Sequence, residues 1–582
     1  MGGPQGSWRL HQLKLPLDHS DDDLTLAICR RLRLRPEQLR RWTLVKRSVD
    51  ARRRDGIRLV YSLDLELDLP APLQRRLAER AAADPHLQPT PDTRYHLPLQ
   101  LPPDHGLARP VVVGAGPCGY FAALLLAQMG LRPLLLERGR DVRSRTADTF
   151  GFWRGQRPLD PESNAQFGEG GAGTFSDGKL YSQVSEPPAY QRKVLEELVA
   201  AGANPEILTL HHPHIGTFKL ATVVRGLRSA IESLGGTVRF QSRVERLALD
   251  PDTRQVQGVL LASGELIPTS QVVLAPGHSA RDVFALLQQQ GVTLQAKPLA
   301  IGLRIEHPQA LIDQARWGTA AGHPRLGAAE YKLVHHCQEP QLAGRSVWSF
   351  CMCPGGLVVG ATSEPGLVVT NGMSQHSRRE RNANSALVVN ITLEDLEPYG
   401  AFAGDPLAGV AFQRHWEQLA FALAGGTHAA PSQSVERFLA ADPGPEAGQP
   451  HAAGSEIAPS VIAPSEIAPC GVKPSYQPGV VDADLAACLP AFVTQALREA
   501  IPRFERVLPG YAAAGARLTG VETRTSSPVR ISRDPISLQS LNTPGLYPAG
   551  EGAGYAGGIL SAAIDGLKVA EAVAAALTAS AR

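Results

Sequence analysis

The longest apolar stretch of the chain, residues 111–136, contains two different patterns of apolar positions. Short runs of valine and leucine at its ends are typical of buried strands, and its Ala/Leu-rich middle is typical of a buried helix. Six positions interrupt the stretch, namely Gly114, Gly116, Pro117, Gly119, Gln128 and Arg132. It is therefore too broken to span a membrane, and it predicts a strand, a turn, a helix and a second strand.

A second set of patterns precedes this stretch and predicts a small α+β domain over residues 1–108. Leu63, Leu65 and Leu67 alternate with acidic and hydroxyl side chains, which is the period of two of a half-buried strand. An acidic run at 21–23 favours the start of a helix. The predicted elements are strands at 8–15, 42–49 and 57–67, a helix at 21–33 and a proline-rich linker at 85–103.

A chain of 582 residues is too long for one hydrophobic core, so the remainder should divide again. We expect a discontinuous cofactor-binding domain at 109–184, 220–297 and 520–582. A cap or substrate domain is expected at 185–219 and 298–519. Within it, residues 427–475 are of low complexity, with Ser-Glu-Ile-Ala-Pro-like units between 455 and 469. Such short units build no packed core, so we expect a mobile insertion without a catalytic role.

Composition narrows the class of protein only a little. The hydrophobic content of 43%, the charged content of 20% and the formal net charge of +2 are ordinary for a soluble protein. Seven scattered cysteines and a polar N-terminus favour a reducing cytoplasm and indicate no secretory signal. The region 30–58 is strongly basic, which leaves two interpretations: an RNA-binding surface, or a solvated or docked face. Aromatic stacking residues do not accompany the charge, so nucleic acid is not the expected partner.

The first chemical motif is the spacing Gly114-x-Gly116-x-x-Gly119, directly after a predicted strand. Gly114 permits a tight turn, Gly116 lets a pyrophosphate approach the backbone, and Gly119 lets the helix pack close to the strand. The second strand ends at Glu137, where a carboxylate would bind a ribose diol. This fingerprint predicts a dinucleotide but does not distinguish NAD from FAD.

Three later motifs favour FAD. The loop 164–174 is dense in glycine, which is typical of backbone laid against a flat or anionic ligand. A strand at 271–274 leads into a small-residue turn after a predicted β-meander, as expected of a flavoprotein whose chain returns to its FAD domain. Near the C-terminus, Gly550-Glu551 precedes a glycine turn that opens a helix, whose positive end would face the flavin.

Together these motifs predict an α/β fold with an FAD/NAD(P)-binding Rossmann-type domain of the three-layer, glutathione-reductase-like kind. The chain contains no second strand-linked G-x-G-x-x-G, so NAD(P)H or another soluble reductant would enter the flavin cavity transiently. The predicted FAD-binding residues are Gly114, Gly116, Gly119, Glu137, Arg138, Gln166, Gly168, Gly170, Gly171, Gly173, Val244, Ala275, Gly277, Gly550, Glu551, Gly557, Gly558 and Ile559.

The candidates for the substrate side are fewer. Lys179 follows the glycine loop, and we interpret it either as a surface lysine or as a cation near the flavin. Cys351 and Cys353 are either a redox pair or small buried side chains before a turn. Arg524 is the third candidate. No metal is expected, because His335, His336 and Cys337 do not show a recognised ligand spacing.

Several longer motifs resemble the uncharacterised FAD-dependent dehydrogenases of bacteria and plastids, often labelled NAD(FAD)-utilising dehydrogenases. They are found at residues 167–180, 349–356, 372–374, 382–386, 524–530 and 550–558, and the likeness extends to 47–52 of the small domain. The resemblance implies an FAD-binding fold with a family-specific cap. It does not supply a substrate.

The expected function is that of an FAD-dependent oxidoreductase that transfers a hydride between FAD and an organic small molecule. The alternatives are an isoprenoid- or carotenoid-type reductase, an NAD(P)H-dependent monooxygenase, and a flavin-carrying RNA-binding or regulatory protein.

Overall fold

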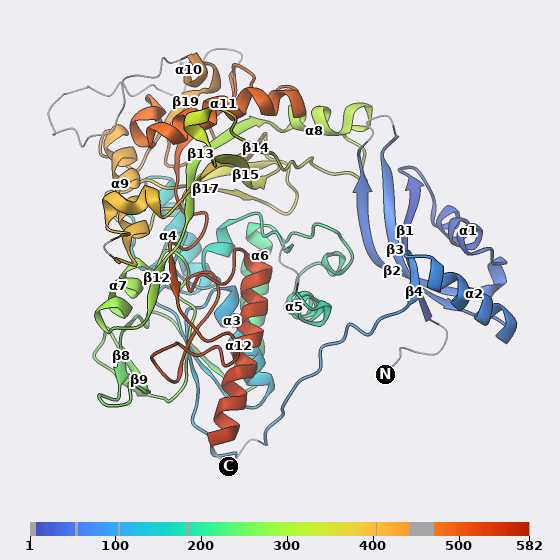
Figure 1. The fold of residues 1–582 in the computed structure, drawn as a ribbon, viewed down its shortest axis with the longest axis horizontal. Helices are drawn as coiled ribbons and strands as arrows, with labels where there is room; N and C mark the ends of the chain where they lie inside the picture. The colour runs from blue at the N-terminus through green and yellow to red at the C-terminus, as the bar shows by residue number, and fades with distance from the viewer. Residues whose placement is uncertain are drawn as a thin grey trace.

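The computed structural model describes residues 7–52, 56–102, 105–181, 186–402, 404–440 and 471–580. Figure 1 shows a small N-terminal domain, in blue, beside a larger body that contains the remaining sheets. In the larger body, a parallel sheet lies toward the C-terminus and the cap lies at the opposite end. Among the described residues, every helix is too short or too polar to cross a membrane.

The N-terminal domain is an antiparallel sheet in the order β2-β3-β1-β4, covered by two helices. Ser20 caps the first helix by accepting a hydrogen bond from the Asp23 amide, which explains the acidic start of that helix. The second helix, at residues 71–83, lies where the sequence predicted no element. The short strand β4, at residues 87–89, lies inside the predicted linker. The elements are β1 (Ser7–Pro16), α1 (Asp21–Leu32), β2 (Leu39–Asp50), β3 (Arg58–Leu67), α2 (Ala71–Ala83) and β4 (Leu87–Pro89).

The central parallel sheet has the strand order β23-β11-β5-β6-β7. Its inner strands consist almost wholly of Val and Leu because helices cover them. A separate antiparallel meander, β10-β9-β8, lies between β7 and β11 in sequence. The strands are β5 (Val111–Val113), β6 (Leu134–Leu136), β7 (Thr237–Arg239), β8 (Val244–Leu249), β9 (Val256–Leu261), β10 (Leu266–Pro268), β11 (Val272–Leu274) and β23 (Leu546–Pro548).

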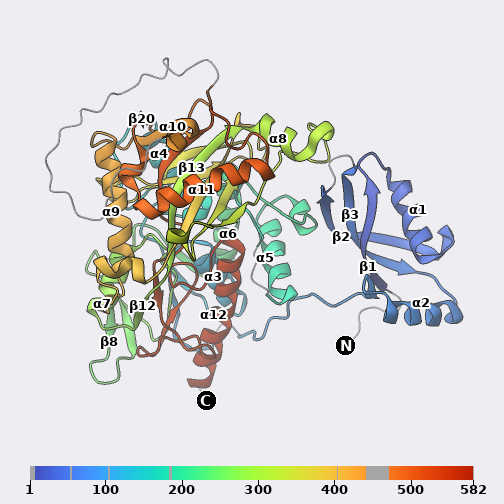
Figure 2. The same cartoon turned by 45° about the horizontal axis from the view of Figure 1, so that its top comes forward.

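The helices of this unit cover the sheet, and α3 lies side by side with α12 in both views (Figures 1 and 2). The helix α5 also belongs here, because Val194 and Leu198 are buried in the same core as α3 and α12. This differs from the expectation that residues 185–219 belong to the cap. The helices are α3 (Pro117–Gln128), α4 (Val142–Trp153), α5 (Pro188–Ala200), α6 (Thr217–Ser233), α7 (Arg281–Gln289) and α12 (Ile559–Ser580).

The cap contains a mixed sheet in the order β14-β15-β18-β13-β21-β19-β20, with a β16–β17 hairpin and a β12–β22 pair beside it. Its strands are β12 (Leu294–Ala296), β13 (Leu299–Pro308), β14 (Val334–His336), β15 (Ser346–Cys353), β16 (Gly356–Gly360), β17 (Thr370–Ser374), β18 (Asn382–Ile391), β19 (Ala430–Ser434), β20 (Val480–Asp482), β21 (Arg517–Glu522) and β22 (Val529–Ile531). Its helices are α8 (Gln309–Trp317), α9 (Ala408–Leu423), α10 (Val435–Ala440) and α11 (Ala491–Val507).

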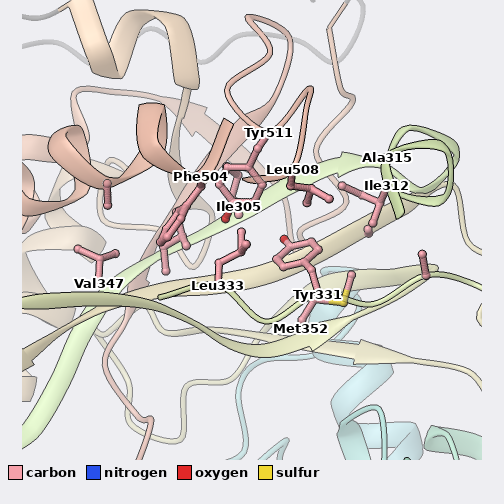
Figure 3. Close-up of a cluster of buried hydrophobic side chains, with 14 of the residues drawn as sticks. Ile305, Ile312, Ala315, Tyr331, Leu333, Val347, Met352, Phe504, Leu508 and Tyr511 are labelled. Atoms are coloured by element: carbon pink, nitrogen blue, oxygen red, sulfur yellow. The ribbon is translucent and has the colours of Figure 1, made fainter. Parts of the chain in front are cut away.

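One face of the cap sheet packs on α8 and α11. Figure 3 shows this core, in which Leu333 and Val347 point from the sheet toward Phe504 and Leu508. Successive side chains of a strand point to opposite faces. The neighbours of Leu333 and Val347 in the sequence therefore face the other side of the sheet.

The prediction of a mobile insertion at 427–475 is wrong for the two ends of that segment. Residues 430–434 form β19 inside the cap sheet, and Phe438 of α10 is fully buried. At the other flank, the backbone amide of Ser475 donates to Glu306. The sequence did not predict the strand because its small and polar residues, which also fit a tightly packed sheet, are typical of an exposed loop. The repeat at 455–469 lies outside the described residues.

Candidate functional site

A single continuous cavity of about 830 Å³ extends from the parallel sheet to the cap. Its lining includes most of the residues that the glycine motifs and the acids predicted. These are Gly114, Gly116, Glu137, Arg138, Gln166, Gly168, Gly171, Gly173, Val244, Ala275, Gly277, Glu551, Gly557, Gly558 and Ile559. The three substrate-side candidates, Lys179, Cys353 and Arg524, line the same cavity.

Three predicted residues do not line the cavity, and each permits close packing behind it. A Cβ on Gly119 would lie 1.8 Å from the Gly114 carbonyl oxygen, so this glycine brings α3 against β5. A Cβ on Gly170 would lie 2.2 Å from the Thr174 hydroxyl, and one on Gly550 would lie 2.7 Å from Cys118.

The first glycine turn leaves open space at one position only. Gly114 has a φ of +99° and no room for a side chain, because a Cβ there would lie 2.2 Å from the Ala275 carbonyl oxygen. At Gly116, which caps α3, the nearest atom to such a Cβ is the Gly171 Cα at 3.9 Å. A ligand can therefore approach the backbone at Gly116, next to the positive end of α3.

Glu137 is buried and joins three loops. Its Oε2 accepts from the Ala115 amide at 2.8 Å, and its Oε1 accepts from Gly139 at 2.9 Å and from Gly168 at 3.0 Å. An ionised carboxylate has about four lone-pair sites. One site on Oε2 thus remains for a hydroxyl donor, as a ribose diol would require. The neighbouring Arg138 pairs with Glu162 and Asp282.

The glycine loop at 164–174 is held by Arg145, which sequence reasoning missed. This side chain is fully buried, and it donates to the carbonyl oxygens of Asn164 at 2.7 Å, Glu169 at 2.8 Å and Gly171 at 2.9 Å. Burial lowers the pKa of Arg145 to about 10, so it stays charged at neutral pH. A single arginine on α4 gives no sequence signal of this role.

A second buried acid, Glu169, braces the same loop from the other side. It accepts from the Tyr120 hydroxyl at 2.8 Å and from the Val142 amide at 2.6 Å. Burial raises the pKa of Glu169 above its ordinary value, and these hydrogen bonds counteract the shift.

The C-terminal motif places a helix start at the cavity. Ideal Cβ atoms on Gly557 and Gly558 would meet nothing within 4 Å, so the backbone is open there. In the described part of the chain, the amides of Gly558 and Ile559 at the start of α12 have no hydrogen-bond acceptor. Glu551 pairs with His278 Nδ1 at 2.9 Å, and His278, which also lines the cavity, was not predicted.

The groups that line the cavity can be compared with the chemical parts of FAD. Two helix N-termini, open glycine backbone on both sides and a carboxylate with a free lone pair match a pyrophosphate, a flavin ring and a ribose. The donor set therefore fits the cofactor that the motifs predicted.

Lys179 belongs to a partly buried polar cluster at the cap side of the cavity. Its Nζ donates to the Met352 carbonyl oxygen and lies 3.9 Å from Asp177 and 3.8 Å from Glu330. Burial alone would lower the pKa of Lys179, but the charges around it, with Asp177 and Glu330 among them, together outweigh burial and raise it. The Lys179 charge is thus largely balanced by two acids.

The two cysteines of β15 differ from a regular strand pair. A bulge interrupts the pairing of β15 with β18 between Phe350 and Cys353, and Cys351 has a φ of +42°. Cys351 is exposed to the cavity, whereas Cys353 is buried. Burial raises the pKa of Cys353 to about 11, so its thiol is protonated at neutral pH, which disfavours thiolate chemistry there.

Arg524 is part of a buried network between the two large units. Glu417 of α9 is fully buried and accepts from Arg281 at 2.6 Å and from Arg524 at 3.1 Å. Arg524 also donates to the hydroxyls of Ser279 and Ser363. Its donors are directed into this network, although its side chain lines the cavity.

In the folded chain, a carboxylate lies next to His335 and Cys337. Glu499 of α11 lies 2.7 Å from His335, and the ligand atoms of His335, Cys337 and Glu499 all lie within 4.8 Å of one another. The same carboxylate accepts from the Gln338 amide, which gives it a structural role without an ion.

The basic N-terminal domain is docked on the larger body. The Arg47 amide donates to Thr209 O at 2.7 Å, and the His211 amide donates to Arg47 O at 3.0 Å. The edge strand β2 is thereby paired with residues 209–211. Next to them, His212 stacks on Tyr181, which lines the cavity.

Comparison with protein families identifies two segments of the chain. A family model described as "FAD-dependent protein, C-terminal domain-like" matches residues 298–462 and 460–525. A model described as a domain of unknown function matches residues 8–66. An uncharacterized protein of Clostridium beijerinckii is 41% identical over 563 residues, covering 97% of this chain and 98% of that protein.

Solved structures resemble parts of the chain at low similarity. Thermovibrio ammonificans THI4 is 19% identical over 33% of this chain and 66% of its own, with a TM-score of 0.23. CtdE, solved in complex with FAD, is 12% identical over 81% of this chain and 88% of its own, with a TM-score of 0.31. The GidA-related protein from Thermus thermophilus is 18% identical over 33% of this chain and 73% of its own, with a TM-score of 0.20.

The family match and the geometry of the cavity agree on the cofactor, which is FAD. The Clostridium beijerinckii relative matches nearly the whole of this chain and of its own length. The chain therefore belongs, with the Clostridium beijerinckii protein, to a family of FAD-dependent proteins.

Proposed function

We propose that this protein is an FAD-dependent oxidoreductase that transfers a hydride between FAD and an organic substrate held beneath the cap. The observation that carries the proposal is the continuity of the cavity, which joins the glycine motifs of the parallel sheet to the inner face of the cap sheet. A cofactor bound along the glycine motifs would thus have its reactive ring at a chamber of mixed polar and apolar lining.

In this proposal, the two halves of the cavity bind the two halves of FAD. Gly114, Gly116 and Glu137 would hold the ADP half, together with the edge of the meander at Val244. The 166–173 loop, Glu551 and the turn at 557–559 would hold the flavin half. Arg145 would contribute indirectly, by fixing the shape of the loop.

FAD supplies hydride acceptance and donation when it is bound. The chain supplies a fixed electrostatic environment for that chemistry. The N-terminus of α12, whose amides at Gly558 and Ile559 are open, directs its positive end toward the cavity and would stabilise negative charge there.

The three substrate-side residues receive different roles in this proposal. Lys179 would face the substrate as a buried cation balanced by Asp177 and Glu330. Cys353 would pack as a protonated thiol under the reacting centre. Arg524, paired with Glu417, would hold the cap on the FAD-binding unit through Ser279 and so act as a positioning residue.

The absorbance spectrum of the purified protein tests the proposal at its base. We expect a yellow protein, or an apoprotein that becomes yellow when FAD is added. A colourless protein that takes up no FAD would contradict it. Anaerobic mixing with NADH, NADPH or reduced ferredoxin, followed by flavin absorbance, then identifies the electron donor. A flavin that no donor and no oxidisable substrate bleaches would contradict the oxidoreductase assignment.

The glycine turn offers a matched pair of variants. Gly116→Ala places a methyl group in open space at the proposed pyrophosphate position, so FAD affinity should fall about tenfold while the apoprotein keeps its thermal midpoint. Gly114→Ala places the same group 2.2 Å from a carbonyl oxygen at a φ of +99° and should lower the midpoint of the apoprotein itself. Thermal melts and FAD titrations of both variants separate the two effects. Equal FAD affinity in Gly116→Ala and the wild type would argue against pyrophosphate binding at this turn.

A further inference from the structure

The cavity-side face of the cap sheet presents an apolar strip with one cation. It consists of Lys332, Val334, Trp348 and Phe350, which all line the cavity, and this set is called the cap strip below. Val334 lies directly opposite Trp348 across the β14–β15 pair. The alternate residues, Leu333 and Val347, face α11 in Figure 3, so the geometry of the strands fixes the opposite direction for the strip.

The strip is large, apolar and accessible from within the cavity. Trp348 and Phe350 are half-buried and pack on small side chains of the neighbouring strands, Ala300 and Ala386 among them. Val334 is 59% exposed, which is unusual for a valine of a sheet beside a buried core. Because Trp348 and Phe350 both line the cavity, a flat molecule inside it can stack on their rings.

The two lysines at this end of the cavity, Lys179 and Lys332, differ in whether acidic groups balance their charge. Lys179 is balanced by Asp177 and Glu330, and Glu330 also accepts from His212 at 2.7 Å. Lys332, by contrast, is exposed and forms no hydrogen bond or ion pair with any residue that the structure describes. A lysine without a partner among the described residues therefore lines the same cavity as the two aromatic rings.

We propose that the cap strip is the substrate subsite for a flat aromatic or conjugated molecule that carries a carboxylate. The ring system stacks on Trp348 and Phe350, and the carboxylate pairs with Lys332 at the outer end of the strip. This inference rests on the proposed function, because the ring must lie over a bound flavin. It adds to that function the chemical class of the substrate and the residues that select it.

A non-reacting probe tests the subsite without knowledge of the true substrate. The FAD-loaded protein is titrated with 2-naphthoate, and perturbation of the flavin absorbance reports binding. The neutral amide 2-naphthamide and the small anion acetate are the comparison ligands. We expect saturable binding of naphthoate, at least about tenfold weaker binding of naphthamide, and no perturbation by acetate, because a charge-assisted hydrogen bond and ring stacking both contribute.

Variants assign the two contributions to residues. Lys332→Gln should weaken naphthoate binding about tenfold and leave naphthamide binding unchanged, whereas Trp348→Ala should weaken both. Trp348→Phe, which keeps a ring, should restore most of the affinity if Trp348→Ala perturbs the sheet. Lys219→Gln removes an exposed lysine of α6 that does not line the cavity and should change nothing.

The outcomes separate this inference from the function on which it rests. A protein that binds no FAD overturns both. A yellow protein whose flavin spectrum is indifferent to naphthoate, or a Lys332→Gln variant that binds naphthoate as well as the wild type, overturns the subsite alone. Equal affinities for naphthoate and naphthamide would likewise contradict the role of Lys332.

Discussion

Replacing Arg145 with methionine is expected to yield a protein that no longer retains FAD and unfolds at lower denaturant concentration. The arginine donates to carbonyl oxygens of Asn164, Glu169 and Gly171. With methionine, the Asn164 oxygen would lose the donor that the structure gives it, whereas the Glu169 and Gly171 oxygens would each keep a hydrogen bond from Thr174. A buried polar group left without a partner costs about 1–3 kcal/mol, and the lost hydrogen bonds from the charged guanidinium add to this cost. The free energy of unfolding should therefore fall by roughly 3 kcal/mol or more.

The control for this experiment lies on the same helix. Arg143 of α4 is exposed, so Arg143→Met should retain FAD and unfold as the wild type does. Denaturant titrations followed by circular dichroism give the stability, and gel filtration followed by absorbance gives the FAD content. Full FAD content in Arg143→Met and in Arg145→Met alike would show that the glycine loop keeps its shape without the buried arginine.

Replacing Glu417 with alanine should have an effect of similar size at a different place. This carboxylate lies between the guanidinium groups of Arg281 and Arg524, and its removal leaves two buried cations facing each other. Breaking a buried ion pair by removing one partner costs about 3–5 kcal/mol. Because Arg281 starts α7 and Glu417 lies on α9, the loss should loosen the cap from the FAD-binding unit.

A neighbouring acid provides the matched comparison. Glu364 also pairs with Arg281, but its side chain is 28% exposed. Glu364→Ala should therefore cost no more than about 1 kcal/mol. Hydrogen exchange of α9 in the two variants measures the loosening. If Glu417→Ala and Glu364→Ala destabilise the protein equally, the burial of the network does not decide its contribution.

The same network makes stability depend on acid pH. Burial alone would raise the pKa of Glu417, but the charges of Arg281 and Arg524 outweigh burial and lower it well below the ordinary value. A carboxyl with a lowered folded-state pKa stabilises the protein above its unfolded value of about 4.3. That contribution should be lost as the pH falls below about 4.3, and Glu417→Ala should abolish this part of the pH dependence of unfolding.

The sequence could predict the parts of the site in which spacing itself carries the chemistry. The three glycines at 114–119, the acid Glu137 and the C-terminal turn at 557–559 each follow a short strand at a fixed distance, and all but Gly119 line the cavity. The glycine motif also predicted a packing contact correctly, because only a residue without a side chain lets α3 approach β5 at Gly119.

The rest of the site depends on long-range contacts that no local pattern encodes. Arg145 reaches residues about 20 positions away, and Glu417 of the cap meets Arg281 of the FAD-binding unit. A bulge at Cys351 interrupts the regular strand, and of the two cysteines only Cys353 is buried. Composition also misled at 430–440, where the small and polar residues 430–434 form a strand of the cap sheet and residues 435–440 form a helix rather than an exposed loop.

The docking of the N-terminal domain has a consequence for measurement. The domain is joined to the body by the extended segment after β4, which is fastened near the C-terminal helix by the hydrogen bond from Tyr95 to Glu571. At its other side it is attached through the pairing of Arg47 with residues 209–211. The His211 amide donates its hydrogen bond to Arg47 of the N-terminal domain rather than to a residue of the larger body. Exchange of this one amide proton with deuterated solvent therefore reports how often the N-terminal domain separates from the larger body.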